Sequence, residues 1–426
     1  MRPSSTPPSR PPIRGRRVAE VIVIGAGVVG ISSALAIQAR GHQVTVLDRA
    51  GVAAEASSGN AGALAFADIE PLATPGILRQ APKWLLDPLG PLSVPPGYAP
   101  RLTPWLWRFW RASRPAAYRA GTAAQAALMD LSRAAFDRQV ADVGGQGFVR
   151  LEGQLQLYEG EGQFRASLLG WELRRAHGVD FRLLESAEEI AALQPGIHQR
   201  FTHAGFTPGW INLTDPKLWV EHLAARFTER GGRIERAEVV SITPGARIMV
   251  EAGELREADH VVLAGGAWSR RLAAALGDPV PLETERGYNT TLPMGAFDLR
   301  TQLTFGGHGF VVTRIGERIR VGGAVELAGL KRPPNYARAD VLLKKAKDFL
   351  PGLNAEGGAR WMGFRPSMPD SLPVIGPASA DARVTYAFGH GHLGLTQAAG
   401  TAEIVADLVT GQAPAIDTSP YQATRF

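Results

Sequence analysis

VIVIGAGVVG, residues 21–30, joins an apolar strand to a glycine-rich turn. Four consecutive apolar residues are typical of a short strand that is buried on both faces of a parallel sheet. The turn has the GxGxxG spacing of dinucleotide-binding folds. In that pattern Gly25 permits the tight turn, Gly27 lets backbone amides approach a pyrophosphate, and Gly30 lets helix and strand pack closely.

The residues on either side of this turn determine how strongly the motif predicts a dinucleotide site. A helix is expected over 31–40, ended by Gly41, and a second strand over 44–47. Asp48 ends that strand, where an acid is placed to accept hydrogen bonds from a ribose. Strand, turn, helix and acid therefore predict a dinucleotide site that includes Gly25, Ala26, Gly27, Val28, Val29, Gly30 and Asp48.

A second apolar strand, which begins at His260, favours FAD over NAD as the dinucleotide, because with the turn that follows it resembles the second strand motif of two-dinucleotide-fold flavoproteins. It runs into the small-residue turn 264–269, which permits close approach of a flavin dinucleotide. The chain has no further GxGxxG fingerprint for a nicotinamide nucleotide. We therefore expect electrons to come from an organic substrate and to leave to a quinone, a carrier protein or oxygen.

Composition excludes several classes of protein. The chain has 426 residues, of which 45% are hydrophobic and 20% charged, and this is enough for two or three domains. The net charge of +6 would suggest a nucleic-acid partner, but residues 1–17 hold five arginines and no acid. The rest of the chain is nearly neutral, so nucleic acid is not expected as a partner. The proline-rich 1–17 segment is predicted to be a disordered tail, with contact to nucleic acid or lipid as the alternative.

The chain contains no cysteine, and this limits its chemistry. Disulfides, a thiolate nucleophile, a cysteine-ligated iron-sulfur cluster and a cysteinyl flavin link are all excluded. No stretch approaches the ~18 apolar residues of a membrane-spanning helix. We expect a cytoplasmic protein with noncovalent FAD, and peripheral contact with the inner face of the cell membrane stays an alternative.

Several later motifs carry a family resemblance. They are ASSGNAG (56–62), TERGY (284–288), GFRPS (363–367), PDSLPVIG (369–376) and GHGHLGLT (389–396). Together with Arg49, these motifs resemble the D-amino-acid oxidase superfamily of FAD proteins. Within it the chain is similar to bacterial D-amino-acid dehydrogenases, of the small-chain type, and to glyphosate oxidoreductase, and the stretches 82–92 and 170–175 also resemble that subgroup. The resemblance extends over nearly all of residues 18–426.

The resemblance implies oxidation of an amino acid, most simply a D-amino acid, by hydride transfer from the α-carbon to flavin N5. The resulting imine would be hydrolysed by water. An alternative is oxidative carbon-nitrogen cleavage of an N-substituted glycine such as glyphosate or sarcosine. A phosphonate substrate would need a further cation, for which Arg314, Arg318, Arg320 and His308 are available. An alternative of another class is a non-catalytic flavin-binding protein that contacts a membrane or a partner.

Three residues are candidates for catalysis. The resemblance assigns Arg365 to the substrate carboxylate, which a guanidinium grips with two hydrogen bonds, although it could instead bridge two loops. Tyr288 is either a clamp on substrate or flavin, or a buried aromatic with a satisfied hydroxyl. Asn289 follows it where related dehydrogenases often carry histidine. His392 either donates a structural hydrogen bond or positions substrate or flavin.

The resemblance also extends the predicted cofactor site. The loop 389–394 precedes a helix expected over 396–410, and its amides would face the flavin pyrimidine, where negative charge accumulates on reduction. No metal site is expected. The additional cofactor residues are Arg49, Ser57, Ser58, Asn60, Ala61, Val239, Ala264, Gly265, Trp268, Gly363, Gly389, His390, Gly391, His392, Leu393, Gly394, Leu395 and Thr396.

The predicted fold class is α/β, as a two-domain flavoprotein with a Rossmann-like FAD-binding domain and an antiparallel-sheet substrate domain. Strands of the substrate domain are expected over 151–158, 310–313 and 319–324. The predicted FAD-binding domain comprises 18–68, 201–275 and 359–426, and the predicted substrate domain comprises 69–200 and 276–358.

A tryptophan-rich helix is expected near residue 105. Leu102, Trp105, Leu106 and Phe109 share one helical face. Such a stripe predicts core packing, with a helix that touches lipid and receives quinone as the alternative.

Overall fold

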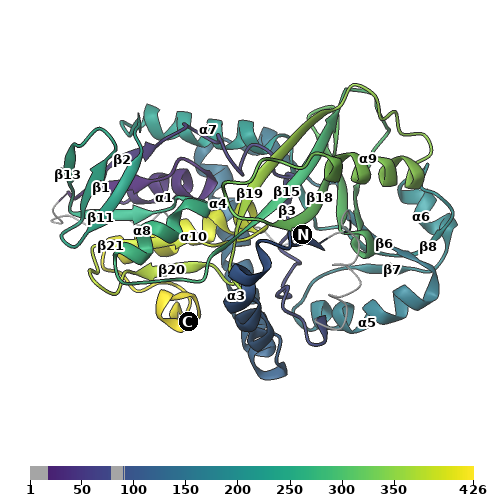
Figure 1. Cartoon of the computed structure of the whole chain (residues 1–426). Coiled ribbons are helices and arrows are strands. Elements are labelled where there is room, and N and C mark those ends of the chain that lie inside the picture. Colours follow the sequence, from purple (N-terminus) through teal and green to yellow (C-terminus); the bar gives the residue numbers. More distant parts are fainter. Residues whose placement is uncertain (1–17, 78–89, 91) are drawn as a thin grey trace.

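The structure is a computed structural model that describes residues 18–77, 90 and 92–426 (Figure 1). The predicted tail over 1–17 and most of the 82–92 stretch, including Trp84, lie outside the described residues.

A six-stranded sheet holds the glycine-rich turn. Its strands pair in parallel except for the last, which is antiparallel to its neighbour. In spatial order they are β10 (Arg233–Arg236), β2 (Gln43–Asp48), β1 (Glu20–Ile24), β14 (His260–Leu263), β21 (Val384–Phe388) and β20 (Val374–Pro377).

Side chains of β1 alternate between two cores, as strand geometry requires. Val21 and Val23 pack in a cluster built with the helices on one face. These helices are α1 (Val28–Gln38), α4 (Pro115–Val143), α7 (Pro216–Glu229) and α10 (Gly394–Val409). Ile22 and Ile24 pack on the other face, against α8 (Ser269–Ala275) and a three-stranded sheet of β11 (Val239–Thr243), β12 (Arg247–Val250) and β13 (Leu255–Glu257).

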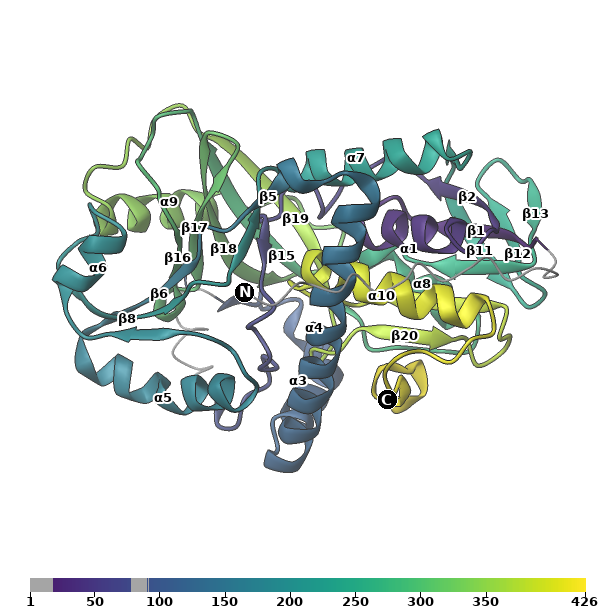
Figure 2. The ribbon, with the colours of Figure 1, turned by 180° about the vertical axis from the view of Figure 1, so that it is seen from behind.

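A nine-stranded, mainly antiparallel sheet forms the other half of the molecule (Figures 1 and 2). Its main path is β19 (Ala359–Ser367), β15 (Glu283–Leu292), β18 (Arg318–Leu327), β17 (Phe310–Ile315), β16 (Gln302–Phe305), β6 (Gln154–Glu159), β8 (Phe201–Thr207) and β7 (Arg182–Leu184), and β4 (Leu92–Ser93) pairs with β18. Helix α9 (Ala337–Phe349) packs on β15 and β18. Helix α5 (Gly160–Ala176) packs on β6 and β8, and α6 (Ala187–Leu193) packs on β8.

Small elements complete the described chain. One sheet comprises β3 (Ala63–Leu64), β9 (Ile211–Leu213) and β5 (Val149–Arg150). Helix α3 (Ala99–Ala112) projects from the body in Figures 1 and 2. Short 3-10 helices cover Gln146–Phe148, Gly266–Trp268, Gly306–His308, Ser419–Tyr421 and Ala423–Arg425. No helix in the described ranges has both the length and the apolar character that a membrane crossing requires.

The two-domain α/β architecture is confirmed, and the strands expected over 151–158, 310–313 and 319–324 are present as β6, β17 and β18, with somewhat different ends. Three elements belong to a different half of the molecule from the one expected. Strands β8 and β19 were expected in the FAD-binding domain, but both hydrogen-bond within the nine-stranded sheet. Helix α4 was expected in the substrate domain, but it packs on α10 in the core beneath the glycine-rich turn. We propose domain boundaries that follow these sheets rather than the sequence positions 200/201 and 358/359.

Candidate active site

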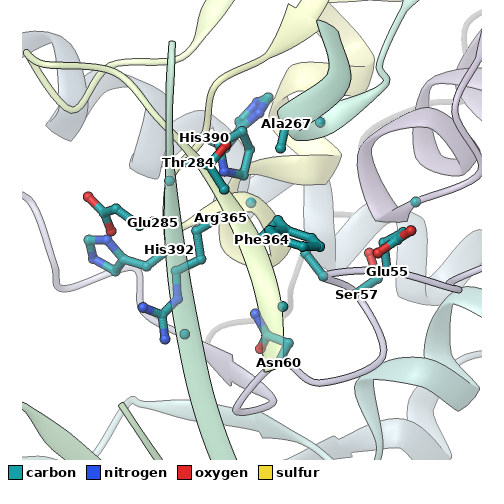
Figure 3. Close-up of a pocket in the computed structure, with 18 of the residues that line it drawn as sticks. Glu55, Ser57, Asn60, Ala267, Thr284, Glu285, Phe364, Arg365, His390 and His392 are labelled. Atoms are coloured by element: carbon teal, nitrogen blue, oxygen red, sulfur yellow. The ribbon is translucent and has the colours of Figure 1, made fainter. Parts of the chain in front are cut away.

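A cavity of about 1620 Å³ has walls from both large sheets. Pockets for drug-sized ligands usually measure about 300–1,000 Å³, so this one has room for a dinucleotide together with a small substrate. Figure 3 shows ten labelled side chains of its wall, drawn from segments far apart in the sequence.

Two glycines of the fingerprint are required by packing. Gly25 has φ +111°, a backbone conformation that favours glycine. A Cβ on Gly25 would collide with the Ala264 carbonyl, and a Cβ on Gly30 would collide with the Gly25 carbonyl. These glycines therefore let β1, α1 and β14 come together at the end of the sheet.

Gly27 has a different role, because it faces the cavity. It caps the N-terminus of α1, which has no side-chain cap and no acid in its first turn. A Cβ added to Gly27 would meet one neighbour within 4 Å, the Ser57 hydroxyl oxygen at 3.4 Å. The Val28 amide donates to that same hydroxyl at 3.1 Å. An uncapped helix N-terminus beside open space fits the pyrophosphate of a dinucleotide.

Asp48 lines the cavity and organises the turn around it. Its Oδ2 accepts from the Ala26 amide at 2.8 Å, and its Oδ1 accepts from the amides of Ala50 and Gly51 at 2.7 and 2.8 Å. The hydrogen bond to a ribose stays a prediction. Further along this wall, the Arg49 guanidinium lies 3.9 Å from the ring centroid of Trp268. It also pairs with Glu55 at 2.5 Å, whose pKa is raised by burial.

The turn 57–62 forms a wall next to the second sheet. The Asn60 side chain accepts from the Gly62 amide at 2.8 Å, and the Asn289 side chain donates to the Gly59 carbonyl at 2.9 Å. Arg320 donates to the Asn60 carbonyl and, at 2.9 Å, to the Thr291 hydroxyl. Asn289 and Arg320 therefore support the turn from β15 and β18. Sequence reasoning missed this role, because nothing local to 57–62 indicates these partners.

Most predicted cofactor residues line the cavity, including Val239, Ala264, Gly265, Trp268 and Gly363. Five stand behind its wall: Ala26, Gly30, Ser58, Gly389 and Thr396. The Thr396 hydroxyl, for example, accepts from the Ala65 amide at 3.0 Å and ties α10 to β3.

The two histidines of the 389–394 loop lie in different environments. His390 is 3% exposed, and its Nε2 lies 3.0 Å from the Thr401 hydroxyl. Burial lowers the pKa of His390 to about 3. His392 instead projects into the cavity beside Glu285 (Figure 3). Burial lowers its pKa, the negative charges of Asp68 and Glu285 oppose that shift, and Arg365 adds to it.

We expect His390 to make the folded protein sensitive to acid. Between its pKa of 6.5 when unfolded and about 3 when folded, only the unfolded chain binds a proton. The free energy of unfolding therefore falls as the pH drops below 6.5, by up to about 1.4 kcal/mol per pH unit. His390→Gln should flatten this profile in urea unfolding, whereas His177→Gln, at an exposed helix end, should not. Equal slopes in both variants would contradict the assignment.

Arg365 occupies the centre of the wall contributed by β19. One guanidinium nitrogen donates to the Ala324 carbonyl at 3.0 Å, and Ala324 has φ +55°, uncommon for a residue with a Cβ. The guanidinium extends across Gly287, where a Cβ would collide with it. Burial lowers the pKa of Arg365 and the charge of Glu285 opposes this. Held from one side and facing the cavity, Arg365 can offer its other donors to a carboxylate.

Tyr288 does not offer a free hydroxyl to the cavity. Its oxygen donates to Glu326 at 2.5 Å and accepts from the Asn335 amide at 3.1 Å. Burial and the Glu326 hydrogen bond raise the pKa of Tyr288. These contacts match the buried-aromatic alternative and give the predicted clamp no support. With Arg286, which donates to the Gly329 and Pro333 carbonyls, Tyr288 fixes the loop 329–335.

Removing the Tyr288 hydroxyl should therefore affect stability more than turnover. Tyr288→Phe leaves Glu326 with one donor fewer and should lower the free energy of unfolding by about 1–3 kcal/mol. We expect kcat/KM to change by less than a few-fold. Tyr336→Phe is the control, because its ring meets that of Tyr288 edge-on at 6.4 Å. A large loss of kcat in Tyr288→Phe with an unchanged free energy of unfolding would contradict this prediction and indicate a catalytic role for Tyr288.

Three of the four cations that could bind a phosphonate substrate do not line the cavity. Arg314 pairs with Glu152, Arg318 lies 3.8 Å from Asp215, and His308 lies 3.4 Å from Glu159. Arg320 does line the cavity, where burial lowers its pKa to about 10. Its donors, however, hold the turn 57–62.

The fold and this cavity define a two-domain dinucleotide-binding oxidoreductase, and comparison with known proteins identifies its family. The family model described as DAO, FAD dependent oxidoreductase, matches residues 20–408. The chain belongs to this family, and its cofactor is FAD.

Relatives of known name are similar over almost their whole length. A D-amino-acid oxidase of Bradyrhizobium diazoefficiens is 36% identical over 425 residues, covering 97% of this chain and 99% of the relative. A D-amino acid dehydrogenase of Xanthobacter autotrophicus is 34% identical over 421 residues, covering 95% and 99%. Among solved structures, glycine oxidase from Geobacillus kaustophilus superimposes with a TM-score of 0.75 at 22% identity, covering 96% of this chain and 100% of that one. The last similarity shows the fold.

Proposed function

We propose that the protein catalyses FAD-dependent oxidative deamination of amino acids, with D-amino acids as its substrates. The observation that carries the proposal is Arg365, a half-buried guanidinium that faces a cavity large enough for FAD and a small acid. The relatives named D-amino-acid oxidase and D-amino acid dehydrogenase support the choice of substrate.

The chemistry divides between cofactor and protein. When bound, FAD supplies the acceptor for the hydride that leaves the α-carbon. Arg365 binds the carboxylate with two parallel hydrogen bonds and so fixes the α-carbon for that transfer. The amine nitrogen loses a proton and forms a double bond to the α-carbon, and water then releases ammonia and a 2-oxo acid. Apolar wall residues such as Trp210 and Phe310 keep bulk water away from the reacting atoms.

Product analysis with paired enantiomers tests this proposal. D-alanine or D-phenylalanine should give one ammonia and one 2-oxo acid per two electrons transferred, while the L-enantiomers should react at least about 100-fold more slowly. Glyoxylate and a primary amine from sarcosine or glyphosate, with no turnover of D-amino acids, would favour the secondary-amine alternative. Bound FAD without turnover of any amine would favour the non-catalytic alternative. Oxygen uptake compared with reduction of a soluble quinone identifies the electron acceptor.

We also propose that α3 contacts anionic lipid, so that the protein associates peripherally with membrane. Leu102 and Trp105 on this helix are buried, as core packing predicts, but Leu106 of the same stripe is 38% exposed, and Trp107 and Trp110 are 51% and 40% exposed. Arginines 111 and 114 lie 4.8 and 4.4 Å from the ring centroids of these tryptophans. No acid occurs between residues 88 and 129. Exposed tryptophans with arginines and no acids are complementary to a negatively charged bilayer surface.

Vesicle flotation tests this contact. The holoenzyme should float with vesicles containing phosphatidylglycerol and not with pure phosphatidylcholine. Replacing both Trp107 and Trp110 by serine should abolish flotation without changing turnover of a soluble substrate. The control is Leu169→Ser, because Leu169 is an exposed apolar residue on α5. Trp361→Ser is unsuitable, because Trp361 lines the cavity. Flotation that survives the double replacement would contradict the proposal.

A further inference from the structure

Glu285 is a buried acid next to the proposed carboxylate anchor. It lies on β15, is 5% exposed, and lines the cavity. In the antiparallel register of β15 with β19, Glu285 is directly opposite Arg365. Opposite residues of such a pair have their Cβ atoms about 4.5–5.5 Å apart, and both side chains stand on the same face of the sheet.

The two side chains do not simply neutralise one another. Gly287 leaves room for the Arg365 guanidinium, which extends over it. In Figure 3 the Glu285 carboxylate lies beside the His392 ring, and the Arg365 guanidinium points away from it. Among the described residues, no salt bridge within 4.0 Å involves Glu285 or Arg365. Each group therefore reaches the cavity without a salt bridge to the other, although the charge of Glu285 still opposes the lowering of the Arg365 pKa.

His392 is not a permanent cation for Glu285. Burial lowers the pKa of His392 even though Asp68 and Glu285 oppose the shift. Burial therefore disfavours the charged imidazole, and among the described residues neither Glu285 nor Asp68 has a positive partner within 4.0 Å inside the cavity. Asp68 has one outside it, since Arg174 lies 3.6 Å away. A buried carboxylate without a partner is costly, and a cationic ligand group would remove that cost.

We propose that Glu285 binds the ammonium group of the substrate and, with Arg365, forms a cradle for a zwitterion. This inference rests on the proposed function and deepens it. Arg365 takes the carboxylate, and Glu285 receives the positive amino group two bonds away. The pair therefore selects amino acids over carboxylic acids of the same shape. A carboxylic acid would bring its negative charge near that of Glu285, and it has no ammonium group to offset the repulsion.

Two ligands that cannot be oxidised isolate this effect. 2-Aminoisobutyrate is a zwitterion without an α-hydrogen, and isobutyrate has the same carbon skeleton without the amino group. Their dissociation constants for FAD-loaded enzyme can be measured from the change in flavin absorbance on binding. The wild type should bind 2-aminoisobutyrate more tightly than isobutyrate.

Glu285→Gln should reverse or abolish this preference. We expect about a 10- to 100-fold weaker affinity for 2-aminoisobutyrate, the range for loss of a hydrogen bond to a charged group. Isobutyrate affinity should be unchanged or higher, because a negative charge has been removed near its carboxylate. Glu285→Asp should recover part of the zwitterion affinity.

Glu283→Gln is the matched control, since Glu283 lies on the same strand and also lines the cavity, but its carboxylate already accepts from the Tyr98 hydroxyl at 3.0 and 3.1 Å. It should keep the wild-type preference. If Glu285→Gln weakens both ligands equally, or neither, Glu285 does not bind the ammonium and the inference is wrong. Because neither ligand turns over, these outcomes are separate from a failure of the proposed function, which would appear as unreacted D-amino acids.

Discussion

Replacing Arg365 by alanine is expected to lower kcat/KM for D-amino acids by about 10²- to 10³-fold. Losing one partner of a buried, charged hydrogen-bonded pair typically costs about 2–5 kcal/mol, and kcat/KM reports that loss directly. FAD content should stay close to wild type, because among the described residues the guanidinium of Arg365 donates to the Ala324 carbonyl and to no residue of the glycine-rich turn. Steady-state kinetics and the flavin-to-protein ratio measure the two effects.

Two further variants make this result specific to Arg365. Arg365→Lys keeps the positive charge but loses the planar fork, so it should recover only part of kcat/KM. Arg314→Ala removes an arginine of the same sheet whose side chain pairs with Glu152, and it should have less than a three-fold effect. Equal losses at both positions, or full activity of Arg365→Ala, would contradict the anchor.

Replacing Gly27 by valine is expected to abolish FAD retention while leaving the apoprotein folded. The backbone at Gly27 has φ −75° and ψ 178°, which any residue adopts, and its Cβ would point into the space proposed for the pyrophosphate. We expect purified protein with less than about a tenth of the wild-type flavin, since a side chain there keeps backbone amides from the phosphates. The thermal midpoint of the apoprotein should be unchanged.

Gly30→Val provides the contrast, because its Cβ would collide with the Gly25 carbonyl. This variant should lose apoprotein stability as well as FAD, which thermal unfolding detects. If Gly27→Val retained FAD, or destabilised the apoprotein as much as Gly30→Val, the assignment of the pyrophosphate position would be wrong.

Residues whose roles depend on local backbone were predictable from the sequence. The turn at Gly25, Gly27 and Gly30 needs only a strand before it and a helix after it, and all three glycines lie where the motif requires. The same holds for Asp48, at the end of the neighbouring parallel strand.

Residues whose roles depend on distant partners were not predictable. The sequence leaves Tyr288 open between a clamp on substrate or flavin and a buried aromatic, and the choice depends on Glu326 of the adjacent strand β18, to which its hydroxyl donates. A register shift between β15 and β18 falls at Arg286 and Tyr288, and no sequence pattern reports it. His390 and His392 are two residues apart and both line the cavity, and only the fold shows that His390 is buried against α10 while His392 is exposed. In the sequence Glu285 is one residue of the TERGY motif, and its position opposite Arg365 appears only once the strands are paired.

Anaerobic reduction of the bound flavin by amino acids tests the central claim most directly. Oxidised enzyme is mixed without oxygen with D-amino acids, L-amino acids, sarcosine and glyphosate, and the flavin absorbance near ~450 nm, a property of the cofactor, is followed. We expect D-amino acids to bleach this flavin absorbance rapidly in the wild type and not in Arg365→Ala. Bleaching by sarcosine or glyphosate alone, or no bleaching by any of these compounds, would contradict the central claim.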